Sequence, residues 1–180
     1  TAVSAGSFSA FAVAQCVAYS GSNEMIDYVQ WSDTVKSYLT VCDNGNYMRV
    51  QSGAIEGKLL VEYYSSDFEP PALKLIDNEL PIFGAFYDSG NNYYVLAVGK
   101  IRNKNDSLEV FRITKYDKNW NKIKSCGLYG ANTTVPFDAG SARMTHSGDH
   151  LLVRTCHEMY KSSDGNNHQS NVTIEVICLQ

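Results

Sequence analysis

The chain has 180 residues, a formal net charge of −4 and an apolar content of 44%. This length can bury the core of one domain, and nothing in the composition demands two. The negative charge and the absence of a long basic stripe argue against nucleic-acid binding, and no apolar run is long enough to span a membrane. The densest lysine cluster, at residues 115–124, is interpreted as a solvated hairpin.

The N-terminal residues contain an apolar run at 8–15 that resembles the end of a signal peptide. Because a basic segment and a starting Met are lacking, we interpret it as a strand of the mature protein. We expect strands at 7–19 and 25–31. A partly helical spacing at 23–36 is the alternative there. The rest of the chain contains a repeated strand motif. The N-terminal strands could complete the last of these repeats by closing a ring, or they could belong to an earlier repeat.

A short motif occurs three times along the chain: a strand, a tight polar turn and a second strand of bulky apolar residues. The turns contain Gly45, Gly90 and Gly148, each beside Asn, Asp or Ser. Glycine at these places predicts hairpins with positive φ. A repeat of roughly 45 to 60 residues predicts a radial or solenoid β array, because each unit must bury its face on a neighbour.

Each repeat divides into short strands. The middle repeat predicts four antiparallel strands with short connections, the layout of one β-propeller blade, at 80–87, 92–101, 107–116 and 120–125. The first repeat predicts strands at 37–42, 47–51, 58–64 and 72–76. The third predicts strands at 141–146, 150–160 and 171–179 and lacks a fourth.

The fold class that follows is all-β: antiparallel blades of a β-propeller or partial propeller, with an irregular β-sandwich as the alternative. The whole chain, residues 1–180, is interpreted as a single β-repeat domain with repeats near 37–76, 80–125 and 141–179. A piece of a larger propeller is a further interpretation, because three and a half blades fall below the usual minimum of about four.

The chain has five cysteines, an odd number, and none forms a Cys-x-x-Cys pair. This spacing argues against a structural zinc site, and no cofactor or metal is predicted. Buried apolar thiols are the favoured interpretation, with one or two disulfides as the alternative. Glycosylation-type triplets at Asn105, Asn132 and Asn171 are compatible with an exported protein. We therefore expect an extracellular or cell-surface location.

The third repeat carries a family resemblance in residues 139–144, 152–160 and 164–169. These segments resemble propeller-like proteins that gut bacteria secrete or display on their surface, and the likeness covers about the last hundred residues. The resemblance implies the blade architecture that kelch and galactose-oxidase-type propellers share. It brings no established active site with it.

The predicted strand order separates two ends of the blades. The hairpins between first and second strands emerge at one end. They are short, so this end is expected to have few residues that could bind a ligand. Longer segments, at 102–106, 127–140 and 161–170, emerge at the other. Because binding residues often lie on loops held by rigid strands, we place the candidate ligand site at the long-loop end. Its candidate residues are Tyr129, Arg143, His157, Glu158, Tyr160, Asp164 and His168.

Three functions remain open from the sequence. The favoured one is an exported, non-catalytic module that binds a glycan or a protein partner, because aromatic faces and planar polar groups suit a sugar. The second is a glycan-active enzyme using Glu158 and Asp164 with His157 and His168. The third is a structural or assembly protein with unpaired blade edges. A metal interpretation of His157, Asp164 and His168 follows no recognised ligand spacing.

Overall fold

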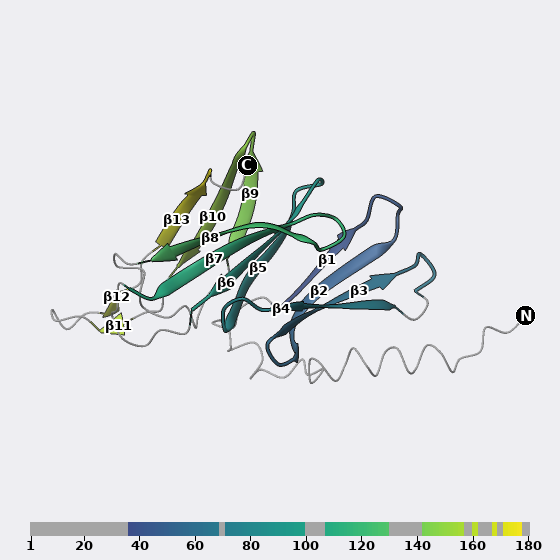
Figure 1. Cartoon of the computed structure of the whole chain (residues 1–180), viewed down its shortest axis with the longest axis horizontal. Helices are drawn as coiled ribbons and strands as arrows, with labels where there is room; N and C mark the ends of the chain where they lie inside the picture. Colours follow the sequence, from purple (N-terminus) through teal and green to yellow (C-terminus); the bar gives the residue numbers. More distant parts are fainter. Residues whose placement is uncertain are drawn as a thin grey trace, which may run out of the picture.

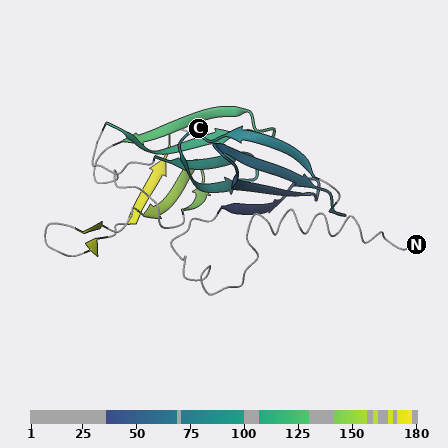
Figure 2. The same cartoon turned by 90° about the horizontal axis from the view of Figure 1, so that it is seen from below.

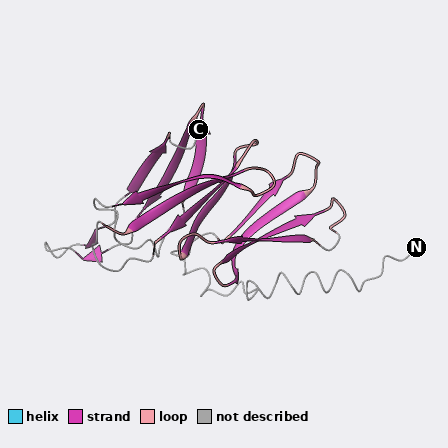
Figure 3. Ribbon diagram, in the orientation of Figure 1, coloured by secondary structure: helices cyan, strands magenta, loops and turns pink. Residues whose placement is uncertain are grey.

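The computed structural model describes residues 36–68, 71–99, 107–129, 142–156, 160–161, 167–168 and 171–177. These residues form thirteen strands, all of which pair in antiparallel fashion, and the described ranges contain no helix (Figures 1 and 3). The all-β prediction is therefore confirmed. The predicted N-terminal strands lie outside the described residues.

The first two repeats fold as predicted, each into a four-stranded sheet whose strands follow one another in chain order. Sheet A consists of β1 (Ser37–Val41), β2 (Tyr47–Ile55), β3 (Lys58–Tyr64) and β4 (Ala72–Asp77). Sheet B consists of β5 (Ile82–Asp88), β6 (Tyr93–Val98), β7 (Glu109–Tyr116) and β8 (Lys122–Tyr129). The predicted bounds hold to within a few residues. The lysine-rich segment forms the β7–β8 hairpin, as expected.

The third repeat forms sheet C, which has three described strands in the order β13–β10–β9. They are β9 (Arg143–Ser147), β10 (His150–Cys156) and β13 (Asn171–Val176). The prediction of one strand over 150–160 is wrong, because β10 ends at Cys156 and Tyr160 belongs to a separate hairpin. That hairpin pairs β11 (Tyr160–Lys161) with β12 (Asn167–His168). Strand alternation therefore does not place Tyr160 on one face with Arg154.

The three repeated turns have the backbone conformation that the sequence predicts. Gly45, Gly90 and Gly148 have φ angles of 80°, 88° and 56°. Residues with a Cβ rarely adopt this region, whereas glycine enters it readily. Side chains reinforce two of the turns: Asp88 Oδ1 accepts the amide of Gly90 at 2.8 Å, and Asn44 Oδ1 accepts that of Asn46 at 3.1 Å.

Sheet B lies between sheets A and C (Figures 1 and 2). Towards sheet A it presents Phe86, Tyr93 and Val95, which join a core with Met48, Val50 and Val61. Towards sheet C it presents Ala85, Leu96 and Ile113, which join a core with Leu151, Val153 and Ile174. Burial on both faces explains why β6 is an almost uninterrupted apolar run. The first strands of sheets B and C, β5 and β9, lie side by side.

Two described cysteines pack against these cores. Cys42 is half-buried beside the core between sheets A and B, and Cys126 is half-buried beside the core between sheets B and C. Their positions agree with the interpretation of cysteine as a small apolar side chain. Cys16 and Cys178 lie outside the described residues.

Candidate functional site

The residues predicted for the long-loop end divide into two groups. Tyr129, at the end of β8, and Arg143, at the start of β9, are described and exposed, with 59% of Tyr129 accessible. The strand directions place both at the end opposite the glycine hairpins, as predicted. Burial raises the pKa of Tyr38, and the charge of Arg143 opposes this shift, so Arg143 lies near β1 of sheet A.

The remaining candidates belong to the third repeat. Tyr160 and His168 are directly paired across the β11–β12 hairpin, so the backbone brings these two positions together. His157, Glu158 and Asp164 lie outside the described residues. The predicted acid–base and metal arrangements that use them therefore stay predictions. Within the described ranges, no group of three His, Cys, Asp or Glu residues could hold a metal ion.

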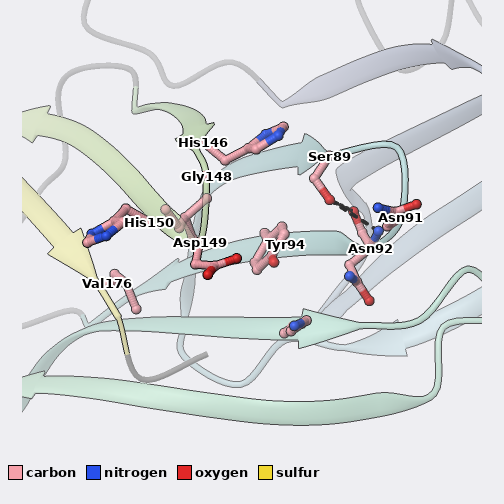
Figure 4. A pocket seen from close by; sticks show the side chains of 11 residues that line it. Ser89, Asn91, Asn92, Tyr94, His146, Gly148, Asp149, His150 and Val176 are labelled. Carbon is pink, nitrogen blue, oxygen red and sulfur yellow. Dashed lines mark hydrogen bonds between the residues drawn. The ribbon is translucent and has the colours of Figure 1, made fainter. Parts of the chain in front are cut away.

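A cavity of about 430 Å³ lies at the opposite end, where the hairpins of sheets B and C meet (Figure 4). Sheet B contributes Ser89, Asn91, Asn92, Tyr94 and Lys115, and sheet C contributes His146, Gly148, Asp149, His150, Leu151 and Val176. This differs from the expectation that the hairpin end offers little. The space forms between two neighbouring sheets, so neither short turn reveals it alone.

The cavity wall on sheet B is a turn fixed by local hydrogen bonds. The Ser89 hydroxyl donates to the Asn92 carbonyl at 3.0 Å, and the Asn92 amide donates back to Ser89 Oγ at 3.1 Å. The Ser89 amide also donates to the Asn92 carbonyl, at 3.0 Å. These bonds fix the backbone of the turn that carries Asn91 and Asn92, so less backbone freedom is lost when a ligand binds.

A hydrogen bond joins the two sheets beside the cavity. The Tyr87 hydroxyl on β5 lies 2.6 Å from His146 Nδ1 on β9. The ring of Tyr87 also packs near Tyr94, with 6.3 Å between ring centroids. On the far wall, His150 Nδ1 lies 2.7 Å from Glu175 Oε1. These contacts orient the side chains of both histidines that line the cavity.

The cavity combines opposite charges with a neutral phenol. Lys115 and Asp149 line it from different sheets. Burial, and secondarily the neighbouring Tyr87, raises the pKa of Tyr94 above its ordinary value, so its hydroxyl stays protonated at neutral pH. In Figure 4 the side chains of Asp149 and Tyr94 project towards the same space. The wall therefore offers hydrogen-bond donors, acceptors and an aromatic ring within one small volume.

The sequence did carry a signal for these residues. The turns Ser89–Asn92 and Ser147–His150 are polar and occupy equivalent places in two successive repeats. Equivalent turns of stacked repeats emerge at the same end of the array. The length of these turns does not reveal the site. Each turn is short, and the cavity forms only where two turns of neighbouring sheets meet.

Comparison with known proteins gives no assignment for the chain. It matches no protein-family model, no curated protein and no solved structure. In the part of the chain that the structure describes, no helix has the length and apolar character needed to cross a membrane.

Proposed function

We propose that this protein is an exported, non-catalytic binding module of the β-propeller type that holds a carbohydrate in the cavity between sheets B and C. The observation that carries the proposal is the convergence of polar side chains from two sheets, together with Tyr94, around about 430 Å³. Small-molecule sites typically have volumes of about 300–1,000 Å³ and a few convergent polar groups.

The lining chemistry favours a carbohydrate over an apolar ligand. A sugar presents many hydroxyl groups, each of which donates and accepts hydrogen bonds. Asn91 and Asn92 can do both, Lys115 donates and Asp149 accepts. Tyr94 adds a ring whose face suits the apolar side of a sugar and a hydroxyl for its edge.

The propeller part of the proposal is supported by the stacking of the sheets. Antiparallel sheets with chain-ordered strands, repeated along the chain and packed face to face, are what a propeller uses as blades. The adjacent position of β5 and β9 agrees with first strands gathering around a common axis. Extracellular or cell-surface location is supported by the three glycosylation-type triplets.

A glycan-array screen of the purified protein, followed by titration with the best glycan, tests the proposed function. We expect binding by the parent and a loss of roughly tenfold in Asp149→Ala, because a hydrogen bond to a charged group contributes about 1.5–3 kcal/mol. Asp43→Ala is the matched control, since Asp43 is an exposed turn carboxylate in the sheet A hairpin and does not line the cavity.

Two results would contradict the cavity as the site. One is equal loss of binding in Asp149→Ala and Asp43→Ala. The other is loss only in a His157→Ala/His168→Ala double variant, which would move the site to the long-loop end. Absence of binding to every glycan would argue for a protein partner or an assembly role instead.

A further inference from the structure

We propose that the outer face of sheet A is the docking surface for the chain segment that precedes β1, residues 1–35. The outer face is the side of sheet A turned away from sheet B. Its apolar and aromatic side chains are Leu39, Val41, Tyr47, Leu60, Tyr64, Leu73 and Leu75 of the strands, together with Phe68, which stacks on Tyr47. This inference concerns the assembly of the fold and is independent of the proposed ligand.

The packing order of the described sheets gives the first argument. The sheets stack in chain order, A, B and C. Each described sheet after the first is covered on one face by the sheet that precedes it in the chain. Sheet A covers the face of sheet B that carries Phe86 and Tyr93. Sheet B covers the face of sheet C that carries Leu151 and Val153. By the same order, the chain before β1 is what covers sheet A.

Exposure on the outer face of sheet A gives the second argument. Leu39 is 68% exposed and Val41 61% on β1, and Leu73 is 63% exposed and Leu75 49% on β4. On the covered face of sheet B, by contrast, Phe86 is only 6% exposed. These four large aliphatic side chains form two exposed pairs on the edge strands of the same face, one on each side of its polar middle.

The opposite end of the stack shows that this is not a general property of end sheets. The outer face of sheet C carries the half-buried Leu152 at its centre, surrounded by exposed polar residues: Arg143, Thr145, Arg154, Thr173 and Glu175. The exposed polar side chains of this face can hydrogen-bond with solvent. The aliphatic side chains are therefore concentrated at the end of the stack where the chain enters.

The middle of the outer face is polar but electrically balanced. Arg49 Nε lies 2.9 Å from Glu62 Oε2, and Gln51 Nε2 donates to the same oxygen at 3.1 Å. Only 12% of each charged side chain is accessible. Because the two charges are paired and each is hydrogen-bonded to Gln51, covering this row with protein leaves no unpaired charge buried.

Phe68 extends the apolar surface towards the hairpin end. Its ring is 52% exposed and stacks on Tyr47, with 5.2 Å between centroids and 9° between planes. Its backbone has φ 56°, a left-handed conformation that is strained for a residue with a Cβ. The Phe68 amide donates to the Ser65 carbonyl at 3.0 Å, so a hydrogen-bonded turn holds the ring in this exposed position.

The composition of residues 1–35 fits this surface. The segment is largely apolar or neutral, and Glu24, Asp27 and Asp33 are its only charged side chains. It joins the sheet directly, since β1 begins at Ser37. A weakly charged segment tethered beside an apolar surface has a high effective concentration there.

Site-specific photo-cross-linking in the full chain tests the proposal. Benzoylphenylalanine replaces Leu73 on the outer face of sheet A, or Thr173 on sheet C as the matched exposed control. Irradiation of mixed ¹⁴N- and ¹⁵N-labelled protein, followed by digestion and mass spectrometry, separates links within one molecule from links between molecules. We expect the probe at 73 to capture peptides of residues 1–35 within the same molecule, and the probe at 173 not to capture them.

Three outcomes would overturn the proposal. Capture of residues 1–35 only by the probe at 173 would mean that the segment completes sheet C. Links between ¹⁴N and ¹⁵N molecules from position 73 would make the face a surface for self-association. Absence of any link from position 73 to residues 1–35 would show that the segment does not cover this face.

Discussion

Sheets A and C both close the stack formed around sheet B, yet their free faces are built differently. Sheet A places an Arg–Glu pair and Gln51 in the middle of its outer face, between aliphatic side chains on the two edge strands. On the corresponding side, sheet C places the half-buried Leu152 at the centre and exposed polar residues around it. A repeated architecture therefore does not make its terminal units equivalent, because each end meets different surroundings.

The largest expected effect comes from breaking the core that holds sheet C to sheet B. Leu96→Ala removes a fully buried side chain facing sheet C and should lower the free energy of unfolding by about 2–5 kcal/mol. Leu108→Ala is the control, because Leu108 is 45% exposed and outside both cores. Urea unfolding followed by tryptophan fluorescence measures both. Similar losses in the two variants would contradict the core assignment.

The Arg49–Glu62 ion pair of sheet A and the His150–Glu175 contact of sheet C should differ in their contribution to stability. Arg49→Met leaves Glu62 unpaired in a largely buried position and should cost about 3 kcal/mol. In sheet C, His150→Ala removes the exposed contact with Glu175 and should cost at most about 1 kcal/mol. Chemical denaturation at pH 7 compares them. An equal cost would mean that the two end faces have the same electrostatic environment.

The hairpin glycines of sheets A and C should behave alike. Gly45→Ala and Gly148→Ala force a residue with a Cβ into the left-handed region and should each cost about 1 kcal/mol. Neither change introduces a steric clash, because an added Cβ meets nothing within 4 Å at either position. Thermal unfolding of each variant provides the measurement. A neutral result at one glycine would show that its hairpin relaxes to another turn type.

The smallest expected effect is a pH dependence at the link between sheets A and B. Burial alone would raise the pKa of Glu79, but hydrogen bonds and charges from Lys122 and Arg112 outweigh it and hold the pKa below its ordinary value. A lowered carboxyl pKa contributes stability above the unfolded-state pKa that is lost as the pH falls through the folded-state pKa.

The variant Glu79→Gln isolates this contribution. The parent should lose more stability than the variant when the pH is lowered from 7 to below the ordinary pKa of 4.5. Urea midpoints at several pH values measure the difference. Parallel pH profiles for the two proteins would contradict the role assigned to Glu79.

Much of the fold was predictable from local sequence. Polar turns with glycine, followed by apolar runs, fixed the hairpins because only certain residues tolerate positive φ. The C-terminal end of β10 at Cys156 was not predictable, since the sequence after Cys156 continues with residue types that are also compatible with a strand. The cavity was missed for another reason: its lining residues lie on two sheets, and His146 meets Tyr87 from 59 positions away along the chain.

The sequence by itself determined that the chain forms short antiparallel strands in repeated units, because turn chemistry and apolar patterning act within a few residues. Only the tertiary structure decided which faces became cores, which aliphatic side chains of sheet A stayed exposed, and where a polar cavity formed. These features depend on how neighbouring sheets stack. Burial is a property of surfaces brought together from distant parts of the chain, and local residue patterns do not encode their pairing.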